Sequence, residues 1–491
     1  MSDLAIIPPR PEPLTPRDSV LRLPRRALSG FGQALRSSAR VAEPATVEEL
    51  QSMLRRASDE GVTVTFRGAG RSYGDAALNE AGLVITLTKL NRILSWNRSS
   101  GEIDVEPGVT IQDVWQHALP DGYWPHVVPG TMAPTIGGCV AMNVHGKNHF
   151  CQGTFGDHVI EFDLVTPSGD ALTCSRTNNE DIFHAAIGGL GMLGVTTRIR
   201  MTLKKVHSGN LSVTGMTVPT LDALFSQMQS REGTSDYLVG WMDAFAKGKN
   251  LGRGVIHAAN YLGEGEDPKA SETLREQGLP SRFLGIPRGW MWRLIKPWVN
   301  NFGMRWINRV KYVMSRLIDG RGRTFLQGHV AFAFLLDYIP RWRDTYGRDG
   351  FIQVQPFVPR GHAKVVFRAI LERCHEANII PYLVVVKRHL PDTYLMSHAL
   401  DGYSLAMDFK VTRESRTKVW EHARTIGDMA AEAGGRIYFA KDCVAEANQV
   451  RACYGDESLE QFTAMRRRLD PKGTLSSELT RRVLPALDEK S

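Results

Sequence analysis

The sequence lacks the features that usually identify membrane-spanning, secreted or zinc-binding proteins. No stretch reaches the roughly 18 uninterrupted apolar residues that a spanning helix needs. Residues 1–24 are rich in proline and mixed in charge, without the apolar stretch of a secretory signal. The six cysteines form no C-x-x-C pair, and none lies near histidines at the spacing of zinc ligands. We therefore expect no integral membrane protein, no metal, and unpaired thiols in a reducing, cytoplasmic compartment.

Internal repeats, low-complexity tracts and a strong charge excess are also absent. Hydrophobic residues make up 42% of the 491 residues and charged residues 23%, as in ordinary globular proteins. The net charge of +8 permits an anionic partner but identifies none. A chain of this length is long enough for two to four domains of roughly 100–200 residues each.

Short apolar segments alternate with helical patterns along the chain, which favours an α/β or α+β fold over an all-β one. We divide the chain into an N-terminal, partly extended segment (1–42), a glycine-rich stretch (43–205), a stretch with longer helices (206–435) and a C-terminal segment (436–491). The expected strands are 62–66, 83–87, 351–357, 382–387 and 436–440, and the expected helices are 46–58, 110–117, 363–377 and 416–433. Thr46 is the expected N-cap of the first helix, and Glu49 completes a capping box.

Three glycine-rich segments lie within the second stretch. The first, residues 67–74 (RGAGRSYG), follows an expected strand, and its backbone N–H groups could hold a pyrophosphate. It is not a dinucleotide-binding G-x-G-x-x-G motif, because Tyr73 occupies the place of the last glycine and no clear helix follows. The others are 129–149, with paired glycines and an HGKNH string, and 188–195 (GGLGMLGV). Any one could be an ordinary turn, but together they indicate a large phosphate-bearing ligand.

These segments resemble the FAD-binding domain of the vanillyl-alcohol oxidase superfamily, which includes oxidases of sugars, alditols and aldonolactones. The resemblance implies a two-domain α+β flavoprotein of the VAO/PCMH type. Both chain ends would build the FAD domain, around an inserted substrate domain of antiparallel sheet and helices. Many members carry a histidine soon after the first loop, in a pattern like R-S-x-G-H, that bonds covalently to the flavin. Asp75 stands at that place here, so noncovalent FAD is implied.

Residues 68–75, 145–149 (HGKNH) and 434–442 (GGRIYFAKD) narrow the resemblance to the decaprenylphosphoryl-ribose oxidase family, over about residues 30–484. Members of that family are flavin subunits that oxidise a lipid-linked ribose for epimerisation to arabinose. Matched by position, the implied FAD contacts are Arg67, Gly68, Ala69, Gly70, Arg71, Ser72, Tyr73, Gly74, Asp75, Gly130, Thr135, Ile136, Gly137, Gly138, His145, Gly146, Lys147, Asn148, Val195 and Tyr438.

The same resemblance places Lys441 at the flavin face, where the family lysine is essential. Oxidation of a secondary alcohol needs a hydride acceptor, which the cofactor supplies, and a base for the hydroxyl proton. A desolvated lysine can have a lowered pKa and take that proton, so the catalytic candidates are Lys441, Lys147 and Tyr73, in that order. Taken alone, a lysine is usually a solvated surface charge, and Tyr438 could be an ordinary core residue.

Five residues match the substrate-binding positions of the family: Trp241, Gln353, Gln355, Lys387 and Ala406. Gln353 and Gln355 would share one face of an expected strand because side chains alternate along a strand. Ala406 departs from the mycobacterial-type pattern, which has a cysteine beside the flavin. Because that cysteine takes no chemical part in the expected reaction, the difference bears on the sugar and lipid specificity and does not exclude the expected activity.

Residues 282–323 combine ten basic residues with one acidic residue and four of the ten tryptophans. Such a mixture suits a membrane interface, where anionic lipids attract the cations and indole rings lie at headgroup level. An ordinary pair of amphipathic helices with a solvated basic face is the alternative. Nucleic acid binding is not expected, since no binding motif accompanies the charge. We expect a peripheral contact at the inner membrane face.

The favoured function is FAD-dependent oxidation of the sugar of a polyprenyl-phosphate glycoside, with a separate short-chain keto-reductase as partner. A second hypothesis is a flavoprotein that oxidises a soluble sugar, alditol or aldonolactone. A third is a noncatalytic protein that binds lipid-linked sugars and keeps the fold, although Lys441 and the three glycine segments argue against it.

Overall fold

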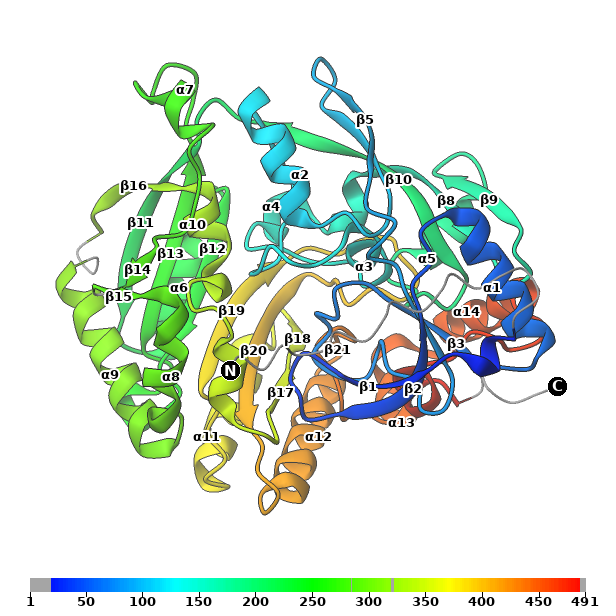
Figure 1. The fold of residues 1–491 in the computed structure, drawn as a ribbon. Coiled ribbons are helices and arrows are strands. Elements are labelled where there is room, and N and C mark those ends of the chain that lie inside the picture. The colour runs from blue at the N-terminus through cyan, green and yellow to red at the C-terminus, as the bar shows by residue number, and fades with distance from the viewer. Residues whose placement is uncertain (1–18, 284, 319–321, 486–491) are drawn as a thin grey trace, which may run out of the picture.

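The computed structural model describes residues 19–283, 285–318 and 322–485, so residues 1–18 of the predicted N-terminal segment lie outside it. The described chain forms sheets of four, six and nine strands and a two-stranded ribbon, β14 (Arg282–Phe283) with β15 (Ile286–Pro287). Helices pack beside the mostly antiparallel sheets (Figure 1). The fold is α+β, as the sequence predicts.

The first sheet has the strand order β1-β2-β4-β3 and carries the first glycine loop at its end. Its strands are β1 (Arg25–Ser29), β2 (Arg36–Ala42), β3 (Val64–Arg67) and β4 (Leu83–Thr86). Helix α1 (Val47–Asp59) connects β2 to β3, and the Thr46 hydroxyl accepts from the Glu49 N–H at 3.2 Å, as predicted. The Glu49 carboxylate accepts from the Ala45 N–H at 2.8 Å, one residue away from the expected capping-box partner.

The second sheet has the order β5-β6-β10-β8-β9, with β7 paired to β10. Its strands are β5 (Ile93–Asn97), β6 (Glu102–Val105), β7 (Tyr123–Pro125), β8 (Val159–Val165), β9 (Ala171–Ser175) and β10 (Val195–Lys205). Its helices are α2 (Ile111–Ala118), α3 (Ile136–Ala141), α4 (His149–Gln152) and α5 (Glu180–Ala186). A capping box between Thr110 and Asp113 starts α2 where the sequence predicts a helix.

The nine-stranded sheet runs β16-β11-β13-β12-β19-β20-β18-β21, with β17 also paired to β20. Its strands are β11 (Asn210–Val218), β12 (Tyr237–Met242), β13 (Gly254–Tyr261), β16 (Thr324–Gly328), β17 (Phe351–Val354), β18 (Pro356–Pro359), β19 (Leu383–His389), β20 (Gly402–Lys410) and β21 (Arg436–Ile437). The helices between these strands are α6 (Leu221–Arg231), α7 (Ala270–Thr273), α8 (Met291–Ile295), α9 (Asn301–Ile318), α10 (His329–Ala333), α11 (Ala363–Glu376) and α12 (Arg416–Glu432).

The predicted strands 351–357 and 436–440 depart most from their expected ranges. The strand expected over 351–357 divides into β17 and β18 at Gln355, since Pro356 has no N–H to donate to the ladder. The strand expected over 436–440 ends at Ile437, and the N–H groups of Lys441 and Asp442 both donate to the Tyr438 carbonyl at 3.0 Å. This turn leaves Lys441 outside the sheet.

The two chain ends form one hydrophobic core (Figure 1). After α13 (Ala447–Tyr454) and α14 (Asp456–Leu469), the chain returns to β3, where the Val64 N–H donates to the Thr474 carbonyl at 2.7 Å. Helix α15 (Glu478–Val483) packs its Leu479 against this N-terminal sheet. A second core lies under the nine-stranded sheet with α6, α11 and α12.

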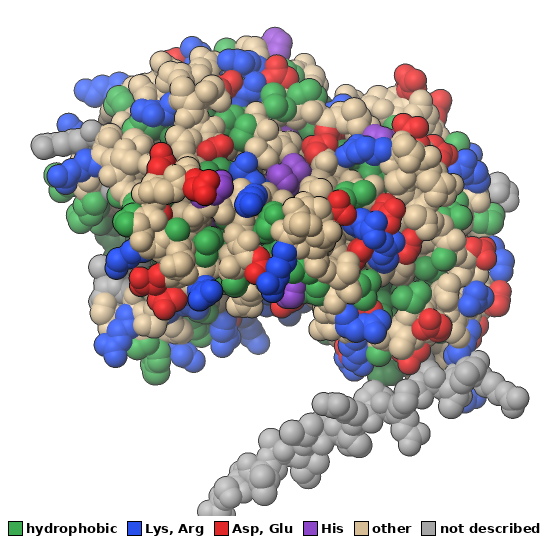
Figure 2. Space-filling view, turned by 90° about the horizontal axis from the view of Figure 1, so that it is seen from above, with side chains coloured by type: hydrophobic (Ala, Val, Ile, Leu, Met, Phe, Trp, Pro, Cys, Tyr) green, Lys and Arg blue, Asp and Glu red, His purple; other side chains and the backbone are tan. Residues whose placement is uncertain are grey.

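No helix within the described ranges is both long and apolar enough to cross a membrane. On the face of the molecule seen in Figure 2, acidic and basic side chains are interspersed over the surface.

Candidate active site

A cavity of about 450 Å³ lies where the first glycine loop, the paired-glycine segment and the nine-stranded sheet meet. All the residues predicted to bind substrate or to take part in catalysis line it: Lys441, Lys147, Tyr73, Trp241, Gln353, Gln355, Lys387 and Ala406. So do most of the predicted FAD contacts: Gly68, Ala69, Gly70, Arg71, Ser72, Tyr73, Gly130, Thr135, Gly137, Gly138, His145, Lys147, Val195 and Tyr438. The structure therefore brings together residues from both ends of the chain.

Six predicted FAD contacts do not line the cavity: Arg67, Gly74, Asp75, Ile136, Gly146 and Asn148. They lie behind the lining and support it. The Arg67 guanidinium donates to the Ser29 carbonyl at 3.0 Å, and the Asn148 amide donates to the His126 carbonyl at 2.7 Å. Asp75 is buried and paired with Arg482 at 2.8 Å, so its carboxylate is held by the C-terminal helix.

Residues 68–72 present backbone donors to the cavity. Among the described residues, the N–H groups of 69–72 donate to no protein acceptor, although these residues line the cavity. A Cβ atom at Gly68 would lie 2.1 Å from the Thr135 Oγ1, so only glycine lets the two loops approach this closely. Consecutive free N–H groups beside Arg71 fit the pyrophosphate of a dinucleotide cofactor.

The cavity wall is strongly cationic. Four lysines line it, Lys147, Lys311, Lys387 and Lys441, whereas no described aspartate or glutamate does. Burial lowers the pKa of Lys147 to about 7 and that of Lys387 to about 8. Lysines held in this way recover their ordinary basicity when an anion enters, so the wall is suited to anionic ligands.

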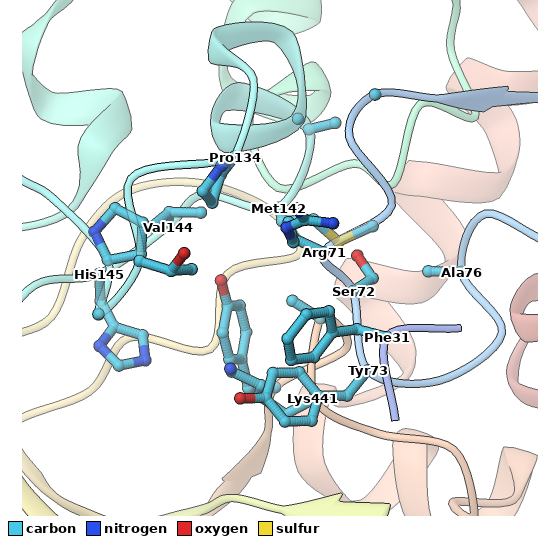
Figure 3. Close-up of a pocket in the computed structure, with 18 of the residues that line it drawn as sticks. Phe31, Arg71, Ser72, Tyr73, Ala76, Pro134, Met142, Val144, His145 and Lys441 are labelled. Carbon is cyan, nitrogen blue, oxygen red and sulfur yellow. The ribbon is translucent and has the colours of Figure 1, made fainter. Parts of the chain in front are cut away.

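Lys441 lies beside Tyr73 at one end of the cavity, with His145 across from them and Arg71 and Ser72 on the loop side (Figure 3). The Lys441 Nζ is 3.6 Å from the centre of the Tyr73 ring. Burial lowers the pKa of Lys441, and the nearby Asp408 carboxylate opposes that shift. Burial and Asp408 both raise the pKa of Tyr73, which keeps its hydroxyl protonated and makes it a weaker candidate for the base than Lys441.

Asp408, which the sequence did not single out, lies on β20 directly behind the lining. Its carboxylate is fully buried, and one oxygen accepts a hydrogen bond from the Gln353 amide. Burial raises the pKa of Asp408, while the charge of Lys441 lowers it. The two groups therefore titrate as a coupled pair in which each favours the charged form of the other.

A buried hydrogen-bond network orients Gln355 and Lys387. The Gln355 Nε2 lies 3.1 Å from the His145 Nε2 and 3.0 Å from the Ser404 hydroxyl, which is itself 2.7 Å from the His389 ring. The Lys387 Nζ lies 3.5 Å from the His145 Nδ1. Burial lowers the pKa of His145 well below its ordinary value, so the ring is neutral, with one nitrogen that donates and one that accepts. No described set of histidines, cysteines or carboxylates is arranged to hold a metal ion.

Sequence reasoning missed several lining residues. Phe31 comes from the N-terminal segment, Leu335 and Leu336 follow α10, and Lys311 belongs to the basic segment that was interpreted as surface. The Lys311 Nζ lies 4.1 Å from the centre of the Trp241 ring. Helical periodicity separates the apolar side of α9 from its polar side, but it does not indicate which side packs against the rest of the protein and places Lys311 at the cavity.

Comparisons with known proteins agree with this geometry. Residues 38–175 match the family model of an FAD binding domain, and residues 355–483 match that of D-arabinono-1,4-lactone oxidase. Decaprenylphosphoryl-beta-D-ribose oxidase of Mycolicibacterium smegmatis is 30% identical over 93% of this chain and 97% of its own length. The chain belongs to the VAO/PCMH flavoprotein family. L-gulonolactone oxidase of Bos taurus is 25% identical over 88% of this chain and 92% of the relative. Cytokinin dehydrogenase 7 of Oryza sativa subsp. japonica is 31% identical over 44% of this chain and 43% of the relative.

This VAO/PCMH flavoprotein is an FAD-dependent oxidoreductase that acts on CH–OH groups, and FAD is its cofactor. The predictions of the family, of FAD as the cofactor and of the enzyme class are thereby confirmed. The free N–H groups of residues 69–72 and the Arg71 guanidinium fit the FAD pyrophosphate. When bound, FAD supplies the acceptor for the hydride that leaves the substrate carbon.

Proposed function

We propose that the protein oxidises a secondary hydroxyl of a polyprenyl-phosphate-linked pentose to the keto sugar, for epimerisation with a separate short-chain keto-reductase. The observation that carries this proposal is a second cationic group in the cavity. Arg71 and the loop N–H groups suffice for the FAD pyrophosphate, yet Lys147, Lys311 and Lys387 line the same cavity from other elements without an acidic partner in the described lining. A sugar phosphate supplies the anion that these lysines need.

One relative that covers 93% of this chain is a decaprenylphosphoryl-beta-D-ribose oxidase, which supports the same substrate class. The second candidate is a soluble sugar, alditol or aldonolactone, favoured by the match of residues 355–483 to D-arabinono-1,4-lactone oxidase. A neutral lactone would leave the three lysines without an anion, so we rank it second.

The proposal assigns FAD binding and substrate binding to different parts of the chain. Residues 43–205 and 436–491 would hold FAD, and residues 206–435 would bind the substrate and contact a membrane. Asp75 lacks the imidazole that forms the covalent bond to flavin in many family members, and its carboxylate is paired with Arg482, which supports noncovalent FAD.

In the proposed reaction, the neutral Lys441 amine accepts the proton of the substrate hydroxyl. The carbon that bears this hydroxyl gives its hydride to the cofactor. Gln353 and Gln355 present amide groups to the sugar, and Lys387 and Lys147 neutralise its phosphate. Burial favours the neutral form of Lys441, which a base requires. Ala406 lies in the lining and leaves room beside the sugar without adding a reactive group.

An absorbance spectrum of the purified protein, before and after acid precipitation, tests the flavin. We expect a yellow protein whose colour passes entirely into the supernatant, because no covalent bond retains FAD. Anaerobic titration with polyprenyl-phosphoryl ribose should then bleach the bound flavin with one equivalent of substrate. Release without bleaching would redirect the substrate search to soluble sugars and lactones, and colour that stays with the precipitate would contradict noncovalent binding.

Replacing Asp408 by asparagine should shift the pH dependence of flavin reduction. The Asp408 carboxylate raises the pKa of Lys441, so its removal lowers that pKa. The base is active when neutral, and activity is lost as pH falls through its pKa. The acid limb of kcat/KM should therefore move to lower pH by about one unit or more. Asp349→Asn, at an exposed position, is the control and should leave the limb in place. An acid limb that does not move in Asp408→Asn would exclude Lys441 as the group that titrates.

A further inference from the structure

Exposed apolar side chains are concentrated in one region. Within the described residues, seventeen large hydrophobic side chains are exposed, and fourteen of them lie between residues 290 and 335. They are Trp290, Leu294, Trp298, Phe302, Trp306, Ile307, Val310, Val313, Met314, Leu317, Ile318, Phe325, Leu326 and Leu335. Proteins rarely leave such a patch exposed to water without a partner for it.

Helix α9 carries the centre of this patch as a narrow stripe. Phe302, Trp306, Val310, Val313 and Leu317 recur every three or four residues and so share one side of the helix, which we call the α9 face. Arg305, Arg309 and Arg316 lie along one edge of that face at helical spacing, and all three are exposed. Residues 286–318 contain seven basic residues and no acidic one.

The opposite side of α9 is already occupied. Asn308 is buried, Lys311 lies over Trp241 at the cavity, and Tyr312 stacks against the Arg253 guanidinium at 4.9 Å. The α9 face is therefore the side that the fold leaves uncovered, while the same helix forms part of the cavity wall. Leu335, half exposed, also lines the cavity and continues the apolar surface to it.

We propose that the α9 face is a membrane-docking surface that lies in the headgroup region of an anionic lipid bilayer. Its apolar stripe would enter the acyl boundary, and the arginines along its edge and the tryptophans at 290 and 298 would lie at headgroup level. A second copy of the chain is a poor partner, because it would bring another set of cations without acids. The inference deepens the proposed function and rests on it in one respect. The polyprenyl chain of the proposed substrate would lie in a bilayer, and docking of the α9 face would bring that bilayer to the cavity.

The charge of the residues around α9 has the sign that an anionic bilayer requires. Acidic and basic side chains are mixed on the face shown in Figure 2, as on an ordinary solvated surface. Around α9 the charge has one sign and accompanies exposed tryptophan, a combination that matches lipid headgroups.

Co-sedimentation of the FAD-loaded, full-length protein with vesicles tests the proposal. We expect binding to phosphatidylcholine vesicles that contain phosphatidylglycerol, weaker binding to phosphatidylcholine alone, and partial loss at high salt, which screens the arginines. The triple variant Phe302→Ser/Trp306→Ser/Leu317→Ser should lower the partition coefficient about tenfold or more. The control Leu94→Ser/Val365→Ser removes exposed apolar side chains elsewhere and should bind as the wild type does.

Three outcomes would overturn the proposal. They are failure of the wild-type protein to bind anionic vesicles, equal binding by the triple variant, and light scattering that shows a wild-type dimer which the triple variant abolishes. The flavin spectrum and the thermal midpoint of the triple variant establish that it is folded. Reduction by detergent-dispersed substrate is measured separately, so vesicle binding without bleaching would contradict the proposed function and leave the docking surface intact.

Discussion

Replacement of Lys441 by methionine is expected to give a folded, yellow protein whose flavin is reduced by substrate about a thousandfold more slowly, within the range usual for loss of a general base. Methionine keeps much of the apolar stem that packs over the Tyr73 ring but cannot take a proton. The neighbouring bases are poor substitutes. Tyr73 is protonated because its pKa is raised, and Lys147 is tied to the Phe332 carbonyl.

Anaerobic stopped-flow measurement of flavin bleaching under single-turnover conditions gives the rate directly. Lys418→Met is the matched control, because Lys418 is exposed on α12, outside the cavity lining, and its loss should change the rate less than twofold. Excess FAD in the assay separates weakened cofactor binding from lost proton transfer. A Lys441→Met rate within about tenfold of wild type would exclude Lys441 as the base, and the same substitution at Lys147 would then test the next candidate.

Local sequence signals predicted the local structure well. Thr46 caps α1 and Thr110 caps α2, because a hydroxyl or carboxylate within three residues can satisfy the first free N–H groups whatever the rest of the chain does. Pro356 marks the break in the strand after Val354, whereas the period-two pattern that Gln353 and Gln355 share predicts one continuous strand.

The assembly of the site depended on long-range packing that periodicity does not encode. No local pattern in the C-terminal segment indicates that Leu475 joins the core beside β3, or that the turn after Tyr438 places Lys441 near the glycine loop. The family resemblance alone implied that this segment returns to the FAD domain. Asp408 was missed because a buried carboxylate and a solvated one look the same in sequence. Lys311 was missed for the opposite reason, since its basic neighbours on α9 suggested a uniformly solvated face.

The position at which many relatives bear a flavin-linked histidine has a structural role here. Asp75 and Asp442 are both buried, and the Arg482 guanidinium bridges them at 2.8 and 2.9 Å. The bridge fastens α15 to the end of the glycine loop. Burial raises the pKa of Asp75 although Arg482 opposes the shift, so the carboxylate depends on its partner to remain charged.

Replacing Arg482 by leucine should therefore lower the free energy of unfolding by about 3–5 kcal/mol at neutral pH, since two buried carboxylates lose their counter-charge. Urea denaturation measures the loss, and Arg467→Leu, at an exposed position on α14, should stay within about 0.5 kcal/mol of wild type. Adding Asp75→Asn to Arg482→Leu should restore part of the stability, because the double variant no longer buries that unpaired charge.

The pH dependence of the single variant separates charge from packing. Without Arg482 the pKa of Asp75 in the folded state rises further above its value in the unfolded state. The loss in the free energy of unfolding is therefore complete above the folded-state pKa and disappears as the carboxyl is protonated. The stability difference between Arg482→Leu and wild type should accordingly shrink as pH falls from 8 toward about 5, the region in which buried carboxyls with raised pKa values titrate. A difference that is constant over this range would assign the loss to packing of the arginine stem, and the bridge would then have no electrostatic role in holding α15 to the glycine loop.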